Sequence, residues 1–309
     1  MQQSTNQALQ LPLLQSREVT LIIKREDQLH PLMSGNKFRK LKYNLEAARL
    51  KKAHTLLTFG GAYSNHILAT AAAAAEHGFK STGIIRGEEL NNRVDENPTL
   101  SKAQSLGMKF IFVSRERYRE LTRDEKKAKH LCAQDGIYMI PEGGSNALAV
   151  KGVSEMLTEE DLAADYICCS VGTGATLAGL VEAARPQQRV LGFAALDHHD
   201  LANEVARFTK KSTYEIIHDY TFGGYAKITD PLVQCMNQWL KQTGILFDPV
   251  YTAKMMFGIL DRVRRGAIPK GSVILAIHTG GLQGIEGMNS RLEKKNAPLI
   301  LTSCTKKAS

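Results

Sequence analysis

The alternation of short β-rich runs with segments of helical length constrains the fold more than any other feature of the sequence. The runs cover Val19–Arg25, Thr55–Phe59, Ser81–Arg86, Lys109–Val113, Ile137–Ile140, Tyr166–Ser170, Val190–Ala195 and Val273–Ile277. Strands separated by helices typically form parallel sheets, because a parallel pair needs a long crossover connection. Several runs are apolar throughout, as in strands that are buried on both faces. The sequence therefore predicts an α/β fold with one or two open, mostly parallel sheets covered by helices.

Composition fits a packed α/β protein and argues against several other classes. The chain has 309 residues, of which 43% are hydrophobic, and this is enough for two domains. The most apolar helical stretch, Ile67 to Ala75, is too short to span a bilayer, so we expect no membrane partner. Five cysteines without C-x-x-C or Cys/His spacing indicate reduced thiols and no metal site. The first residues lack a signal-peptide pattern, and we therefore expect a cytoplasmic protein.

The net charge of +9 raises the question of nucleic-acid binding. The lysines and arginines are spread along the chain, and only 6% of the residues are aromatic. The densest basic stretch, from Arg115 to Lys129, also contains four acidic residues, which is typical of a solvated helix face. We expect no nucleic-acid partner, and the charge favours anionic ligands instead.

Lys37 occupies a position that favours unusual chemistry. It lies in Ser34–Lys40, between an extended run and a helical pattern, with Asn36 predicted as the N-cap. The positive end of the helix and the neighbouring Arg39 and Lys40 are expected to lower the pKa of Lys37. A neutral amine can form a Schiff base, although an ordinary surface lysine is the common alternative.

Two glycine-containing loops follow predicted strands and open predicted helices. In Gly60–His66, Ser64 is predicted as the N-cap, and the free N–H groups of such a helix start bind carboxylate or phosphate. In Ser170–Gly179, the glycines and two threonines can surround an anion. A dinucleotide-binding loop is the rival interpretation, but Leu177 takes the place of the third glycine of G-x-G-x-x-G. A cup for one phosphate is the better prediction.

Taken together, these stretches resemble one family. The matching segments are Asn36–Lys40, Ser64–His66, Pro141–Asn146, Gly172–Thr176, Asp248–Tyr251 and His278–Gly281. They resemble the D-cysteine desulfhydrase and 1-aminocyclopropane-1-carboxylate deaminase family of pyridoxal-phosphate enzymes, which has the tryptophan-synthase-β-like fold (fold type II). The resemblance implies two α/β domains with the cofactor in the cleft between them. We assign residues 1–45 and 148–309 to the large domain and residues 46–147 to the small one.

The resemblance also implies a role for each site residue. Lys37 would carry pyridoxal phosphate as a Schiff base, and Asn65 would bond its ring hydroxyl. The substrate carboxylate would bind Ser64, Asn65 and His66. Two tyrosines, Tyr225 and Tyr251, would flank the substrate as catalytic groups. The phosphate would bind Lys40, Gly172, Thr173, Gly174, Ala175 and Thr176.

The implied reaction is an α,β-elimination by a lyase, in which either Lys37 or Ser64 removes the α-proton. With D-cysteine as the substrate, the products are pyruvate, ammonia and sulfide. By resemblance, the deaminases carry a glutamate after the second tyrosine, where this chain has Thr252, so Thr279 becomes the predicted partner of the pyridine nitrogen. This favours the desulfhydrase. A deaminase, a non-catalytic pyridoxal-phosphate-binding protein and a different amino-acid substrate of either handedness remain alternatives, and a homodimer is expected.

Overall fold

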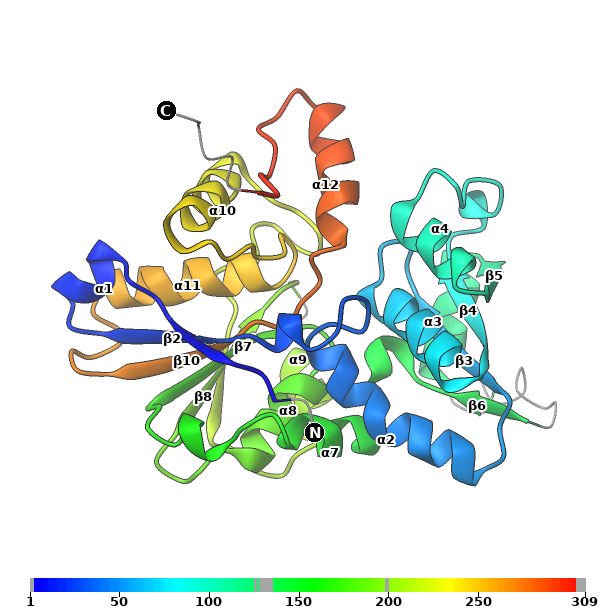
Figure 1. Ribbon diagram of the computed structural model, residues 1–309, viewed down its shortest axis with the longest axis horizontal. Coiled ribbons are helices and arrows are strands. Elements are labelled where there is room, and N and C mark those ends of the chain that lie inside the picture. Colours follow the sequence, from blue (N-terminus) through cyan, green and yellow to red (C-terminus); the bar gives the residue numbers. More distant parts are fainter. Residues whose placement is uncertain (1–2, 125–126, 128–135, 198–199, 304–309) are drawn as a thin grey trace.

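Two parallel sheets organise the chain in the computed structural model, which describes residues 3–124, 127, 136–197 and 200–303 (Figure 1). The larger sheet has the strand order β1-β2-β10-β7-β8-β9, and its edge strand β1 pairs antiparallel with β2. Its strands are β1 (Asn6–Ala8), β2 (Thr20–Lys24), β7 (Tyr166–Val171), β8 (Arg189–Ala194), β9 (Tyr214–Ile217) and β10 (Val273–Ile277). The smaller sheet, in the order β5-β4-β3-β6, is parallel throughout. It contains β3 (Thr55–Gly60), β4 (Lys80–Arg86), β5 (Met108–Val113) and β6 (Ile137–Met139).

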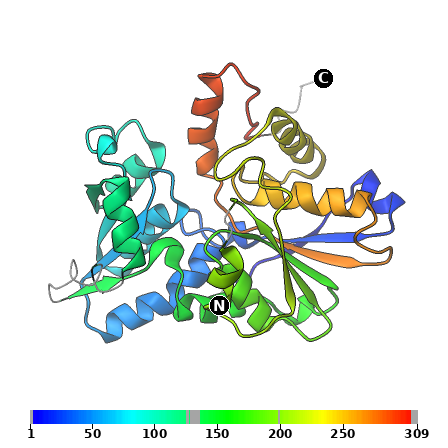
Figure 2. The same cartoon turned by 180° about the vertical axis from the view of Figure 1, so that it is seen from behind.

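Helices cover both faces of the larger sheet (Figures 1 and 2). One face packs on α1 (Pro12–Ser16), α10 (Asp230–Thr243), α11 (Thr252–Arg264) and α12 (Gly284–Glu293). The other packs on α7 (Ala147–Ser154), α8 (Ala175–Ala183) and α9 (Leu201–Ala206). Successive strand residues point to opposite faces, so Ile274 joins the first core and Leu275 the second. This explains why the central strands are apolar at every position.

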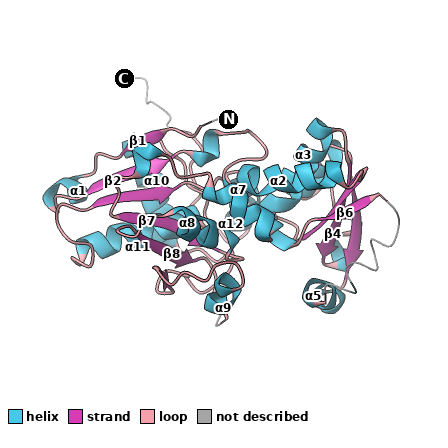
Figure 3. Cartoon of the chain, turned by 90° about the horizontal axis from the view of Figure 1, so that it is seen from below, coloured by secondary structure: helices cyan, strands magenta, loops and turns pink. Residues whose placement is uncertain are grey.

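The smaller sheet has its own helical cover. Its helices are α3 (Asn65–His77), α4 (Pro98–Ser105) and α5 (Arg115–Arg123). The connecting helix α2 (Asn36–Leu50) starts beside the larger sheet, packs on α7, and contributes Leu41 and Leu45 to a core shared with α3. Seen from below, α2 and α7 lie between the two sheets (Figure 3).

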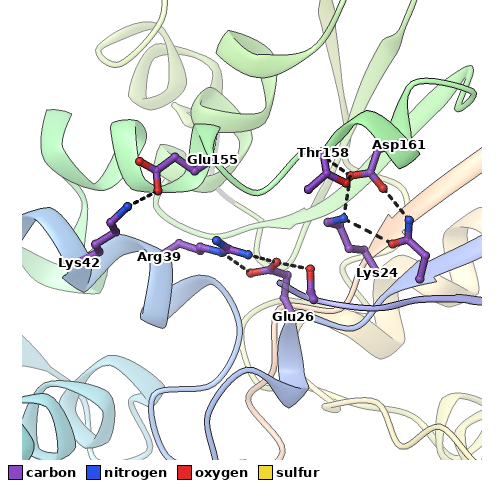
Figure 4. Close-up of polar contacts among 9 residues, drawn as sticks. Lys24, Glu26, Arg39, Lys42, Glu155, Thr158 and Asp161 are labelled. Atoms are coloured by element: carbon purple, nitrogen blue, oxygen red, sulfur yellow. Dashed lines mark hydrogen bonds and ion pairs between the residues drawn. The ribbon is translucent and has the colours of Figure 1, made fainter. Parts of the chain in front are cut away.

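Buried charges fix the start of α2 (Figure 4). Arg39 donates two hydrogen bonds to the Glu26 carboxylate, at 2.9 Å and 2.8 Å. Ser4 adds a bond of 2.7 Å to the same carboxylate. Further along the sheet, the buried Lys24 pairs with Asp161 at 2.7 Å. A bidentate pair holds a fixed geometry, so Arg39 orients the helix that carries Lys37.

The predicted fold class is confirmed, and all eight predicted strands are present within two residues of their predicted ends. The predictions missed β1 and β9, which are the two edge strands of the larger sheet. The division into domains at residues 45 and 148 stays a prediction. No helix among the described residues is long and apolar enough to cross a membrane. Part of the basic stretch that follows Arg123 lies outside the described residues.

Candidate functional site

The predicted motifs meet where the carboxyl ends of the two sheets face each other. We call this place the junction, and it consists of residues 34–40, 60–66, 141–146, 171–176 and 278–283. Two hydrogen bonds link its segments. The Lys40 Nζ atom donates to the carbonyl oxygen of Gly143 at 3.1 Å. The Gln283 side chain donates to Asn65 Oδ1 at 2.6 Å. Ligands of open α/β sheets bind at the carboxyl ends of strands, so this placement favours a ligand site.

Helix α2 begins at the junction in a way that the sequence did not predict. Gly35 is its N-cap, with φ +63°, and the side chain of Asn36 does not cap the helix. The N-cap prediction for Asn36 is therefore wrong. A Cβ atom on Gly35 would overlap the carbonyl group of Thr279, so glycine is required at this contact. Asn36 instead donates to the Thr176 hydroxyl at 2.8 Å and thereby links the starts of α2 and α8.

The pKa of Lys37 is lowered from 10.5 to about 8. Burial is the cause, and the Asp248 carboxylate partly offsets it. The predicted direction is thus confirmed, but the largest cause is burial rather than the predicted helix end and neighbouring cations. The Glu26 carboxylate neutralises Arg39. Because about one tenth of an amine with this pKa is neutral at pH 7, Lys37 can act as a nucleophile.

Lys40 supplies a buried cation beside Lys37. Its side chain donates to Gly143 and, at 3.3 Å, to the Ser145 hydroxyl, which lies 2.5 Å from the Thr173 hydroxyl. Burial and the charge of Lys37 hold the pKa of Lys40 well below its usual value. Within the described residues Lys40 has no carboxylate partner. An amine without a carboxylate partner, next to the hydroxyl groups of Ser145 and Thr173, fits a phosphate group.

The loop Gly172–Gly174 has the shape of an anion cradle. Gly174 has φ +83° and is the N-cap of α8. A Cβ atom there would lie 3.1 Å from a methyl group of Val205. On Gly172, a Cβ atom would lie 3.2 Å from the Tyr251 ring. Glycine at positions 172 and 174 therefore lets Tyr251 and Val205 pack closely against the loop. The start of the nine-residue helix α8 offers free backbone N–H groups to a phosphate. With the amine of Lys40, these residues fit the phosphate of the predicted cofactor.

The second loop places Ser64, Asn65 and His66 at the start of α3. Ser64 is the N-cap, as predicted, and accepts from the Ile67 N–H at 3.4 Å. The His66 side chain is buried and bonds to the Thr58 hydroxyl at 2.8 Å. Burial, with the charges of Lys37 and Lys40, holds its pKa well below the usual value. The backbone N–H of His66 can therefore bind a carboxylate, while its neutral, buried ring bonds to Thr58 on β3.

Tyr225 and Tyr251 lie together, although 25 residues separate them in the sequence. Their ring centroids are 6.2 Å apart with an angle of 67° between the planes. Burial raises the pKa of both hydroxyl groups, and the neighbouring Tyr225 adds to the rise for Tyr251. The Tyr225 ring is 48% exposed, so part of this pair is open to a ligand.

Thr252 and Thr279 differ in their surroundings. Thr252 is fully buried, and its hydroxyl accepts from the backbone N–H of Asp248 at 2.8 Å. The Asp248 carboxylate in turn accepts from the N–H of Tyr251 at 2.7 Å, and burial raises its pKa to about 6. Thr252 is thus engaged at the start of α11. Thr279 is half-buried at the end of β10, beside Gly35.

Sequence reasoning missed three side chains at the site. Gln283 orients Asn65, Glu142 accepts from the Tyr118 hydroxyl at 2.6 Å, and Lys254 binds the loop that precedes Tyr225. Lys254 carried a detectable signal, because it lies three residues after Tyr251 and the next six residues of the helix have no polar side chain. Gln283 carried no local signal.

Comparisons with known proteins agree with this geometry. The family model for pyridoxal-phosphate dependent enzymes matches residues 5–280. A Pyrococcus horikoshii protein, provisionally named 1-aminocyclopropane-1-carboxylate deaminase, is 32% identical over 87% of each chain. D-cysteine desulfhydrase of Klebsiella pneumoniae is 30% identical over 84% of this chain and 86% of its own length. A crystal structure described as a 1-aminocyclopropane-1-carboxylate deaminase homologue superposes with a TM-score of 0.79, at 30% identity, over 94% of this chain and 93% of its own.

Proposed function

Because the chain belongs to the family of pyridoxal-phosphate-dependent enzymes, we propose that it catalyses α,β-elimination on D-cysteine. The overall reaction converts D-cysteine and water to pyruvate, ammonia and hydrogen sulfide. The family and its cofactor are those that the motifs predicted. The choice of substrate rests on one observation, the buried threonine at position 252.

We propose that residues of the junction bind the cofactor. Lys37 attaches it covalently, Lys40 and the segment Gly172–Thr176 bind its phosphate, and Asn65 bonds its ring hydroxyl. Thr279 lies at the end of β10 and is the proposed partner of the pyridine nitrogen. The bound cofactor supplies an electron sink that acidifies the substrate's α-hydrogen.

The chain's own residues then bind the substrate and move its protons. The N–H groups at the start of α3 and the Ser64 hydroxyl bind the substrate carboxylate. Either Lys37, with its pKa of about 8, or Ser64 removes the α-proton. The hydroxyl pair of Tyr225 and Tyr251 borders the substrate and orients its β-substituent. With raised pKa values, both tyrosines stay protonated near neutral pH and act as hydrogen-bond donors.

Thr252 favours thiolate elimination over opening of a cyclopropane ring. A carboxylate next to the pyridine nitrogen would keep that nitrogen protonated and strengthen the electron sink. Thr252 supplies no carboxylate, and its hydroxyl is engaged with Asp248. Thiolate leaves readily and needs little carbanion stabilisation, whereas 1-aminocyclopropane-1-carboxylate has no α-hydrogen to lose. The deaminase remains the second candidate, because a relative at 32% identity carries that name.

A side-by-side assay of the two substrates tests this proposal. Enzyme saturated with cofactor should form pyruvate and sulfide from D-cysteine, and little or no 2-oxobutanoate from 1-aminocyclopropane-1-carboxylate. L-cysteine in a parallel assay reports the handedness. Faster turnover of the cyclopropane substrate would refute the argument from Thr252 and leave the cofactor site intact.

The pKa of Lys37 predicts how cofactor rebinding depends on pH. Only the neutral amine attacks the cofactor aldehyde, so the rate constant for reconstituting the apoprotein should rise about tenfold per unit below pH 8 and level off above it. N-acetyl-lysine amide, treated with pyridoxal phosphate in the same buffers, corrects for ionisation of the cofactor. A corrected rate that still rises between pH 9 and pH 10 would contradict the lowered pKa.

We also propose, from the family resemblance, that the enzyme is a cytoplasmic homodimer. Sedimentation of the holoenzyme should then give about twice the chain mass of 34.1 kDa. A species at the mass of one chain would contradict the dimer.

A further inference from the structure

Lys254 is a buried lysine to which neither the sequence motifs nor the proposed reaction assigns a role. It lies on α11, only 1% exposed, and the described residues place no carboxylate within ion-pair distance of its Nζ atom. The Nζ atom instead donates to three backbone carbonyl groups. The acceptors are Ala195 at 3.1 Å, Thr221 at 2.8 Å and Gly224 at 2.8 Å. A buried ammonium group costs free energy, which three good acceptors offset.

Two of these acceptors lie in a segment with an unfavourable backbone. Phe222 has φ +52° and Ala226 has φ +53°, and neither is a glycine. Gly223 and Gly224 between them also have positive φ. Non-glycine residues in this region of backbone conformation are strained and persist only where the surroundings hold them. The segment therefore needs external support to keep its shape.

One face of α11 supplies that support. Asp261 accepts from the Tyr220 hydroxyl at 2.9 Å, and Phe257 packs edge-on against Phe222 at 5.1 Å. Nearer the start of the helix, Lys254 binds the carbonyl of Gly224, the residue before Tyr225. α11 therefore holds the segment at two places, near Tyr220 and Phe222 and again at Gly224.

The same helix carries the partner of Tyr225. Tyr251 is the N-cap of α11, three residues before Lys254, and its ring packs edge-on against the Tyr225 ring. The third acceptor, Ala195, follows the end of β8. Lys254 thus links the end of β8 to the backbone of Thr221 and Gly224, just before Tyr225.

We propose that Lys254 is a positioning residue for Tyr225. It holds Thr221–Tyr225 in its strained conformation against the end of β8, and so keeps the Tyr225 ring against that of Tyr251. The proposal rests on the proposed function in so far as Tyr225 borders the substrate. Lys254 acts through Tyr225 and does not touch the substrate.

Hydrogen exchange tests the structural half of this proposal without any need for activity. Lys254→Met keeps the length of the side chain and removes all three donors. Amides of residues 221–226 should exchange at least about tenfold faster in this variant. Residues 171–176 serve as an internal control and should be unchanged, since general unfolding would accelerate both segments. Should the methionine variant not fold, Lys254→Gln keeps two N–H donors and should give an intermediate rate. Unchanged exchange at residues 221–226 overturns the proposal.

A double-mutant cycle tests the functional half. Lys254→Met and Tyr225→Phe should lower kcat/KM for D-cysteine by similar factors, and the double variant should lose little more than either. Losses that multiply would show that Lys254 acts independently of Tyr225 and would refute the positioning role. A wild-type protein without elimination activity would refute the proposed function instead, and the exchange experiment would still decide whether Lys254 holds the segment.

Discussion

Replacing Lys37 by arginine is expected to lower kcat/KM for D-cysteine at least about a thousandfold. An arginine side chain stays protonated in proteins, so it can neither attach the cofactor nor accept a proton. A general base alone contributes about 10²–10⁴-fold, and this variant loses the covalent attachment as well. The measurement is steady-state kinetics in the presence of excess pyridoxal phosphate.

Lys42→Arg on the same helix is the matched control. Lys42 pairs with Glu155 at 2.6 Å, away from the junction, and arginine can keep this pair. Its kcat/KM should stay within about twofold of wild type, as is usual for substitutions away from a site. Near-normal activity of Lys37→Arg, with the control also normal, would remove Lys37 from the proposed mechanism.

Gly174→Asp is expected to weaken cofactor binding more than about a hundredfold. The new side chain would enter space filled by α9, where a Cβ atom lies 3.1 Å from Val205 and 3.3 Å from the backbone of Glu204. The loop that binds the phosphate must then move away from α9, and the added negative charge further disfavours an anionic ligand. A hundredfold loss of affinity corresponds to about 2.8 kcal/mol. Equilibrium titration of the apoprotein, followed by absorbance, gives the dissociation constant.

Two further variants separate the causes. Gly174→Ala adds the crowding and backbone strain without the charge. Its affinity for the cofactor should therefore lie between those of the wild type and Gly174→Asp. Gly271→Asp carries similar strain at φ +80°, where a Cβ atom would meet no neighbour within 4 Å, and should bind the cofactor normally. Normal binding by Gly174→Asp would mean that the phosphate lies elsewhere.

Local sequence patterns predicted the central strands. These strands are covered by helices on both faces, and they are therefore apolar at every position. β7 is one of these, with all six of its residues buried. The edge strand β1 has three residues and none of them is buried, while β9 has only Ile217 buried. Such short edge strands leave no run of apolar residues for a sequence pattern to detect.

Local sequence patterns predicted some of the contacts at the candidate site and missed others. Ser64 capped its helix as predicted, because an N-cap depends on neighbours within three residues. The start of α2 depends instead on a contact between Gly35 and Thr279, which are far apart in the sequence. The pKa of Lys37 likewise depends on burial by the fold rather than on adjacent charges. Contacts of this kind have no local pattern, and for the same reason Gln283 was missed.

Borohydride reduction of the holoenzyme, followed by peptide mapping, tests the central claim most directly. Reduction makes the link between the cofactor and its lysine permanent, so mass spectrometry can locate it. Lys40 and Lys254 also have lowered pKa values and are the natural competitors. The amines of Lys40 and Lys254 donate hydrogen bonds to backbone carbonyl groups, whereas the described residues give the Lys37 amine no hydrogen-bond acceptor. The account predicts the label on Lys37, and a label on any other lysine, or none, would contradict it.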